Sequence, residues 1–227
     1  MNINFPQLEK SIQLNNGGAT ILAIEDESVL AQILFSLSRE TDYFKIFDDD
    51  YNDYSSRAIF ILNPLDFSVN DRKITKVLHD KIILQMNQEI ELKQEIERDY
   101  MRLNDKIYDF VSMNNDLEFS YGEKNTVEDI LKSIKLTISQ DGTSDVLGVL
   151  QSILKIVKEL SLSELVIFSG VGMLLGEVEY KVVLEQCRLD RLTVLFLENF
   201  RNINSGIPYI LLDKDFVLFD EDGKIVL

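Results

Sequence analysis

Three glycines, Gly170, Gly172 and Gly176, follow the apolar run 165–168 and precede a helical pattern, and Glu198 ends the next apolar run. A glycine-rich turn between a strand and a helix, with an acid further on, is typical of dinucleotide-binding folds, where glycines let the backbone approach the pyrophosphate. The spacing here has one residue too many between the second and third glycines. A nucleotide contact and a plain strand-to-helix turn both stay open, and we favour the plain turn.

Acidic residues that gather ahead of a helical pattern near Val127 offer a second kind of chemistry. The candidates for a metal site are Asp116, Glu118, Glu123 and Glu128. Calcium takes six to eight oxygen ligands, which carboxylates supply, but the spacing is not that of an EF-hand. A calcium site and a solvated acidic loop at a helix N-terminus are therefore the two interpretations.

Basic side chains form two groups that could follow a phosphate backbone. The candidates for DNA binding are Arg72, Lys73, Lys76, Lys132 and Lys135. The first three occupy one helical turn, and the last two are three residues apart, so we expect them to share a helix face. Because no acid lies between Asp129 and Asp141, the sequence indicates that Lys132 and Lys135 are not neutralised locally. The alternative is a solvated helix face.

The sequence lacks the residue sets of common catalytic sites. It contains no G-x-x-x-x-G-K-[ST] phosphate loop, and a single His79 and a single Cys187 exclude the usual Cys/His zinc sites. Cys187 lies within a helical pattern and is predicted to be a buried thiol. We therefore expect no catalytic residues, no nucleotide cofactor and a protein that is not an enzyme.

The charge distribution restricts where a polyanion could bind. The chain has 227 residues, 45% of them hydrophobic, and a net charge of −16, which argues against general nucleic-acid binding. However, residues 71–160 contain 13 of the 23 basic residues, so any such contact is expected there. No apolar run approaches the roughly 20 residues of a membrane span, and no signal peptide is recognisable, so a cytoplasmic protein is expected.

Strand-like segments lie near both ends of the chain, and helical patterns lie between them. Short apolar, β-branched runs bounded by turn residues predict buried strands at 3–5, 11–14, 20–24, 58–62, 165–168, 192–197, 209–212 and 216–219. These segments predict an α/β fold: a split α/β head with a central sheet built from both termini, and an inserted all-helical domain. The predicted boundaries are 1–62 plus 161–227 for the head domain and 63–160 for the inserted helical domain.

The stretch 71–111 has neither glycine nor proline and predicts one long helix, or two with a bend near Asn87. Its apolar residues Ile96, Tyr100, Leu103, Ile107 and Phe110 alternate steps of four and three. Such a heptad-like seam packs against another helix, from the same chain or from a partner. A purely structural helical interaction protein is therefore one hypothesis, beside a nucleotide-binding enzyme that uses the Gly170–Gly176 turn.

Several segments, taken in order, resemble the Csn-two family, the small adaptation proteins of type II-A CRISPR systems. The matching segments are 1–6, 19–26, 65–70, 76–79, 192–198, 208–213 and 215–216. The resemblance implies a split α/β head without a working phosphate loop, an inserted helical domain and a ring-shaped homotetramer. It further implies that the ring takes double-stranded DNA ends through a basic hole, holds calcium, and acts beside the CRISPR integrase and effector nuclease.

The resemblance carries over to individual residues unevenly. Lys76 and Lys132 match lysines of the family, whereas Lys135 has no clear counterpart. Lys124 and Asn125 replace residues that are acidic or apolar in the family's acidic loop, which weakens the calcium prediction. The family has a proline after its first helix where this chain has 87–90, so the resemblance implies a straighter helix here. The resulting hypothesis is a non-catalytic, sequence-independent DNA-end binding homotetramer in CRISPR spacer acquisition.

Overall fold

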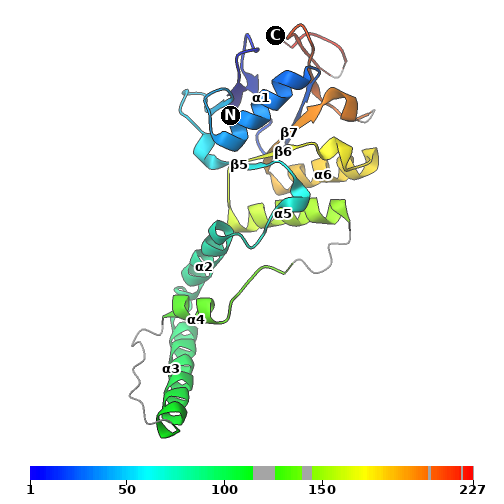
Figure 1. Ribbon diagram of the computed structural model, residues 1–227. Coiled ribbons are helices and arrows are strands. Elements are labelled where there is room, and N and C mark those ends of the chain that lie inside the picture. Colours follow the sequence, from blue (N-terminus) through cyan, green and yellow to red (C-terminus); the bar gives the residue numbers. More distant parts are fainter. Residues whose placement is uncertain (115–125, 140–144, 204–205, 221, 227) are drawn as a thin grey trace. The chain divides into compact units, whose positions relative to one another are not determined.

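The computed structural model describes residues 1–114, 126–139, 145–203, 206–220 and 222–226, and the chain divides into two compact units (Figure 1). The first unit, called the head below, comprises Met1–Ser68 and Gln140–Leu227. The second, called the helical unit, comprises Val69–Ser139. None of the described helices combines the length and the apolar character that crossing a bilayer requires.

A six-stranded sheet in the order β5-β6-β7-β3-β8-β9 forms the centre of the head. Its strands are β3 (Ala19–Ile24), β5 (Ala58–Ile61), β6 (Leu165–Ser169), β7 (Thr193–Asn199), β8 (Ile210–Leu212) and β9 (Leu218–Phe219). All neighbours are parallel except β8 and β9. Because β3 pairs with β7 on one side and β8 on the other, the predicted α/β class with a sheet built from both ends of the chain is confirmed.

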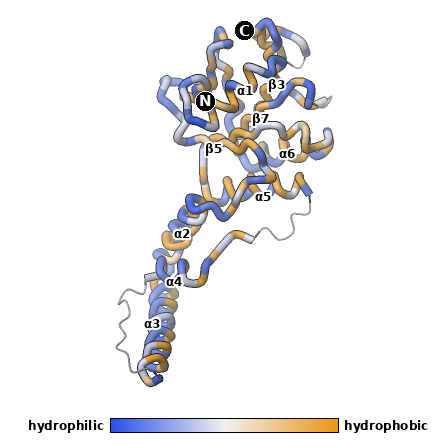
Figure 2. Tube along the Cα trace, viewed as in Figure 1, coloured by the Kyte–Doolittle hydropathy of each residue, from blue (hydrophilic) through white to orange (hydrophobic). Residues whose placement is uncertain are grey.

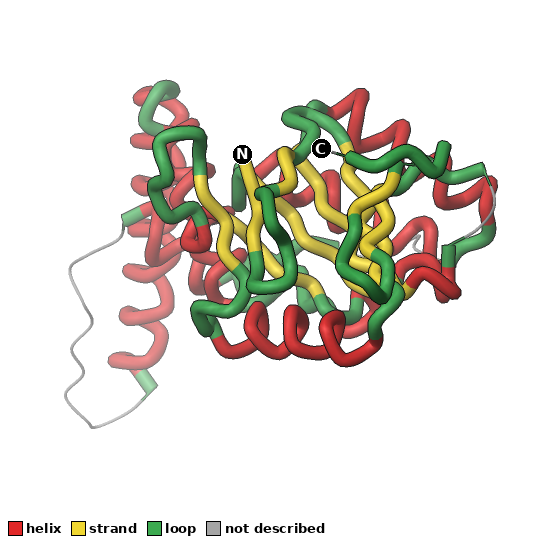
Figure 3. Tube along the Cα trace, turned by 90° about the horizontal axis from the view of Figure 1, so that it is seen from above, coloured by secondary structure: helices red, strands yellow, loops and turns green. Residues whose placement is uncertain are grey.

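Helices cover both faces of this sheet, as parallel sheets require (Figure 3). Helix α1 (Glu27–Arg39) packs Val29 and Ile33 into the core on one face. Helices α5 (Val146–Leu160) and α6 (Glu177–Asp190) form the core on the other face. Every residue of β6 is buried, which explains why its sequence is a continuous apolar run rather than an alternating one.

Helix α5 corrects the predicted domain boundary at residue 160. Its apolar side, with Leu150, Ile153, Leu154 and Val157, is buried together with side chains of β6 and β7. The helix therefore belongs to the head, and the compact helical unit ends at Ser139 instead. An amphipathic pattern reveals that a helix buries one face, but it does not reveal which core receives that face.

The first predicted strands form a separate three-stranded antiparallel sheet in the order β2-β1-β4. It consists of β1 (Asn2–Asn4), β2 (Ile12–Gln13) and β4 (Lys45–Phe47). Ile3, Ile12 and Ile46 point into the same core as α1, while their neighbours along each strand are more exposed. Short 3-10 turns follow or precede the strands: η1 (Ser55–Arg57), η2 (Pro64–Asp66), η3 (Val171–Met173) and η4 (Phe200–Asn202).

The helical unit contains α2 (Arg72–Met86), α3 (Ile90–Met113) and α4 (Val127–Ser133), which contact one another. Of the two alternatives predicted for 71–111, two helices that separate near Asn87 are the one that the structure has. Asn87 ends α2, and its side-chain oxygen accepts a hydrogen bond from Lys93 Nζ at 2.9 Å. The asparagine amide binds polar groups nearby, so the break forms without a proline.

Candidate nucleic-acid interface

The start of α2 displays three of the predicted DNA-binding residues. Asp71 caps the helix by accepting a hydrogen bond from the Lys73 backbone N–H at 2.7 Å. Ile74 is buried and fixes which side of the helix faces inward, while Arg72, Lys73 and Lys76 are exposed. Among the described residues, no carboxylate forms an ion pair with any of these three cations.

This placement opposes the local preference of a helix. Cations in a first helical turn are unfavourable because the N-terminus carries a partial positive charge of its own. Here Arg72 and Lys73 occupy the first turn and Lys76 follows one turn later. The Asp71 carboxylate caps this helix start and takes up the Lys73 N–H, but the three cationic side chains outnumber it and create a region of positive potential that suits phosphate oxygens.

The second pair of candidates is arranged differently from the prediction. Lys132 Nζ lies 2.7 Å from the Glu128 carboxylate, one turn earlier on α4. The hydrogen bond and charge of Glu128 raise the pKa of Lys132, so the expectation that it lacks a local counter-ion is wrong. Lys135 lies beyond the end of α4 with φ of +52°, so it does not share a helix face with Lys132. A left-handed residue at this point turns the chain out of the helix.

The calcium prediction rests largely on residues outside those that the structure describes. Asp116, Glu118 and Glu123 are in that part of the chain. Glu128 is described, and its carboxylate is occupied by Lys132. Within the described ranges, no group of three or more His, Cys, Asp or Glu side chains lies close enough to hold a metal. A cation that used Glu128 would have to displace the Lys132 ammonium.

Helix α3 carries further cations that the sequence candidates omitted. Arg98, Arg102 and Lys106 follow one another in steps of four, so they lie along one side of the helix, and all three are exposed. Arg102 contacts Asp99 at 3.2 Å, so part of this charge is neutralised. The step of four was the signal that could have identified these residues.

The described residues leave the apolar seam of α3 largely uncovered. No residue of α3 is buried, although α2 and α4 contact it. Leu103, Ile107 and Phe110 are 52%, 53% and 69% exposed. Figure 2 shows hydrophobic positions recurring along an otherwise hydrophilic α3. A row of large apolar side chains at heptad-like spacing that remains open to solvent is typical of a helix that contacts a partner.

The glycine turn of the head does not form a phosphate site. Gly176 precedes α6, and its N–H donates to the Glu179 carboxylate at 2.9 Å. Glu177 lies in the same first turn. Two carboxylates therefore occupy the helix start where a pyrophosphate would bind, and their negative charge would repel it.

Glu198 is buried beneath this turn rather than presented to a ligand. Its Oε1 accepts hydrogen bonds from the Gly172 N–H at 2.9 Å and from the Tyr180 hydroxyl at 3.2 Å, and within the described part of the chain its Oε2 has no hydrogen-bond partner. Burial raises the pKa of Glu198 to about 7. Since this acid cannot reach a ribose, the second element of the dinucleotide pattern is missing, and the geometry favours the plain-turn interpretation.

Cys187 lies in the core between α6 and the sheet, as predicted. Burial raises the pKa of its thiol to about 12. The thiolate that nucleophilic chemistry or metal binding needs is therefore not formed near neutral pH.

The chain is thus of the class that combines an α/β head, built from both ends of the chain, with an inserted helical unit bearing cations and an open apolar seam. Residues 38–216 match the model of the family described as CRISPR-associated protein (Cas_Csn2), and the chain belongs to this family. The resemblance seen in the sequence is confirmed.

Individual relatives agree with this assignment. The chain is 28% identical over 223 residues to the CRISPR-associated protein Csn2 of Streptococcus agalactiae, which covers 97% of this chain and 98% of the relative. It is likewise 28% identical over 224 residues to Csn2 of Enterococcus faecalis, with coverage of 96% and 98%. Among solved structures, Stu0660 of Streptococcus thermophilus superposes with a TM-score of 0.57 and 14% identity, covering 94% of this chain and 74% of that chain, and therefore shares its fold.

Proposed function

We propose that the protein binds the ends of double-stranded DNA without reading their sequence, as a ring-shaped homotetramer without catalytic activity, during CRISPR spacer acquisition. Its partners in this role are further copies of itself, the CRISPR integrase and the effector nuclease. The observation that carries the proposal is the group of exposed, unpaired cations at the start of α2, in a chain of the Cas_Csn2 family.

The uncovered seam of α3 supports the assembly. Leu103, Ile107 and Phe110 gain from burial against another helix about 25 cal/mol per Å² of apolar surface. A second copy of the chain offers the same seam, so one surface serves both partners in a symmetric contact that pairs two chains. A ring of four needs a second contact between such pairs.

Repetition of the cations makes DNA binding compatible with a net charge of −16. Arg72, Lys73 and Lys76 in one chain form a weak site, but four copies around a common opening add their contacts. If each chain neutralises about two phosphates, the logarithm of the affinity falls with the logarithm of the salt concentration with a slope of roughly −7. Phosphate contacts position the protein and carry no sequence information, so little sequence preference is expected.

Calcium remains part of the proposal, with Asp116, Glu118, Glu123 and Glu128 as ligands. Metal that takes Glu128 releases Lys132 from its ion pair and frees that ammonium for a phosphate. Calcium is therefore expected to strengthen DNA binding, and Lys132→Ala is expected to weaken this calcium effect. Gel shifts of both proteins with calcium and with chelator measure it, and an identical calcium effect in both would contradict the coupling.

A competition between DNA topologies tests the function itself. A linear duplex and a relaxed covalently closed circle of the same sequence compete for the protein in a gel shift. Threading through a ring predicts that the linear form is retained and the circle is not. Cutting the circle once with a restriction enzyme should restore binding, and equal retention of both forms would contradict end binding.

Substitution in the seam separates assembly from folding. Leu103→Asp combined with Ile107→Asp is expected to dissociate the oligomer and abolish retention of linear DNA, while far-ultraviolet circular dichroism stays unchanged. The matched control is Val178→Asp, because Val178 is 76% exposed on α6 of the head. An unchanged oligomer in the double variant would place the subunit contact elsewhere.

A further inference from the structure

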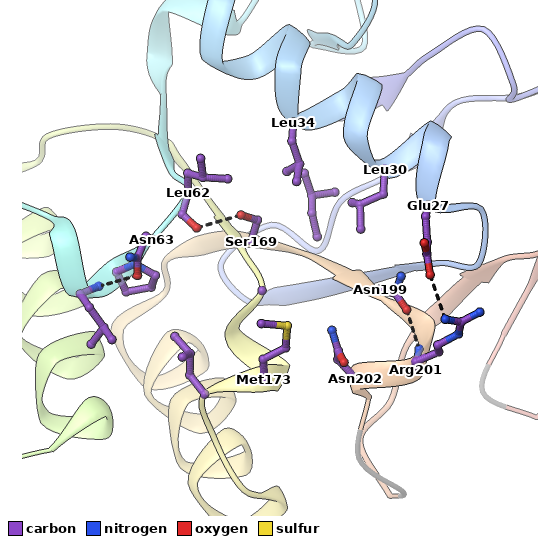
Figure 4. Close-up of a pocket in the computed structure, with 15 residues that line it drawn as sticks. Glu27, Leu30, Leu34, Leu62, Asn63, Ser169, Met173, Asn199, Arg201 and Asn202 are labelled. Atoms are coloured by element: carbon purple, nitrogen blue, oxygen red, sulfur yellow. Dashed lines mark hydrogen bonds and ion pairs between the residues drawn. The ribbon is translucent and has the colours of Figure 1, made fainter.

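The head contains a cavity of about 640 Å³ at the edge of the sheet where β5, β6 and β7 end (Figure 4). Helix α1 forms one wall, and the segments that follow the three strands form the rest. In open parallel sheets, ligands bind outside the carboxyl ends of the strands. The volume lies within the range of about 300–1,000 Å³ that is usual for small-molecule sites.

The apolar side chains that line this cavity are more exposed than those of a packed hydrophobic core. Met173 is 69% exposed, and Leu62 and Leu65 are 52% and 51% exposed. In Figure 4, Leu30 and Leu34 of α1 lie across the cavity from Met173. Two opposed aliphatic walls, one of them with a polarisable thioether, suit the faces of a flat aromatic ring.

The charged groups of the cavity neutralise each other. Arg201 contacts Glu27 at 2.9 Å, and among the described residues of the lining these two are the only charged ones. A phosphate would therefore have to compete with Glu27 for Arg201, and the nearby start of α6 carries Glu177 and Glu179. The ligand that fits best carries no net charge.

Two asparagines supply hydrogen-bonding capacity. Asn199 Oδ1 accepts from the Arg201 backbone N–H at 3.0 Å, and among the described residues its amide nitrogen has no partner. The amide of Asn202 is directed toward the cavity in Figure 4 and has no protein partner within the described part of the chain. An amide offers a donor beside an acceptor, which matches the edge of a nucleobase.

We propose that this cavity binds the base of an unphosphorylated nucleoside, with the ring between α1 and Met173 and its edge on Asn202. Gly170 lines the cavity, and a side chain at this position would meet no atom within 4 Å, so the backbone leaves open space beside the ring. The site lies wholly in the head and does not depend on the proposed DNA binding.

Saturation-transfer NMR titrations of the intact protein without DNA test the proposal. The probes are the four 2′-deoxynucleosides and their 5′-monophosphates. At least one nucleoside is expected to saturate with a dissociation constant of about 1 mM or tighter. Its monophosphate is expected to bind about tenfold more weakly or worse, because Glu27 pairs with Arg201 in the lining and repels the phosphate. Absence of saturation by all four nucleosides, or equal binding of the monophosphate, would overturn it.

Matched variants locate the binding. Met173→Trp fills the cavity from an exposed position, and Asn202→Asp replaces the donor of the amide with an isosteric acceptor. Both variants are expected to weaken binding of the nucleoside by about tenfold or more. Val178→Trp, exposed on α6 and outside the lining, is the control and should bind as the parent protein does. Unchanged binding in Met173→Trp would show that the nucleoside binds elsewhere.

Discussion

The head and the helical unit treat their apolar residues in opposite ways. In the head, β6 is buried along its whole length, and α1, α5 and α6 cover the sheet on both faces. In the helical unit, the 24-residue helix α3 buries none of its residues. The head therefore buries its own hydrophobic surface, whereas α3 leaves its seam available to another molecule.

The charges follow the same division. Cations at the head surface are largely paired, as in Arg57 with Glu164 and Lys181 with Glu177. At the start of α2, Arg72, Lys73 and Lys76 have no ion-pair partner among the described residues. The comparison teaches that the head buries and pairs its own groups, and that the helical unit presents the groups that we propose for assembly and DNA binding.

The largest expected effect on stability tests that the two hydrophobic core clusters lie in the head. Leu154→Ala empties a fully buried position on α5 and is expected to lower the free energy of unfolding by about 2–5 kcal/mol. The matched change Leu84→Ala, at a position 63% exposed on α2, should alter it by no more than about 0.5 kcal/mol. Urea unfolding measures both, and equal losses would contradict the contrast between the units.

The next effect concerns the buried carboxyl of Glu198. Its pKa is about 7 in the folded protein and 4.5 ordinarily, so the folded state holds its proton more tightly. The contribution of this carboxyl to the free energy of unfolding is fully present below pH 4.5 and is lost as the pH rises to about 7. The loss is about 3 kcal/mol at most.

Glu198→Gln keeps an acceptor for the Gly172 N–H and the Tyr180 hydroxyl but cannot ionise. Relative to the parent protein, the variant should therefore become more stable as the pH is raised from 5 to 8. Urea unfolding at both pH values gives the difference. A variant whose stability changes with pH just as the parent's does would show that Glu198 does not titrate in this range.

The smallest effect distinguishes the two groups of cations in the helical unit. Lys76→Ala removes an unpaired charge and should reduce DNA affinity several-fold and make the salt slope shallower, by about one for each lost phosphate contact. In the absence of calcium, Lys132→Ala should change the DNA affinity and the salt slope less, because Glu128 already pairs with Lys132. Fluorescence titrations at several salt concentrations compare them, and a larger effect of Lys132 would reverse the assignment.

The sequence predicted the features that depend on local periodicity. The runs 165–168 and 192–197 are continuously apolar because both faces of β6 and β7 are covered, and the strands were found where they lie. The ion pair of Lys132 could also have been predicted from the sequence, since Glu128 lies four residues earlier, at the usual spacing of helical pairs.

Other features depend on tertiary structure and could not be predicted. The pattern of α5 revealed an apolar face but not that the head core receives it. The left-handed backbone of Lys135 has no signature in its residue type. Glu198 ends an apolar strand, and only the turn folded over it shows that its carboxyl is buried. The cavity likewise joins residues from four distant segments.

The molar mass in solution, measured by light scattering with and without a short linear duplex, tests most directly that the helical unit assembles copies of the chain around DNA. The account predicts a particle of four times the 26.2 kDa of one chain, to which a single duplex adds its mass. A strictly monomeric protein that binds linear and circular DNA alike would contradict it.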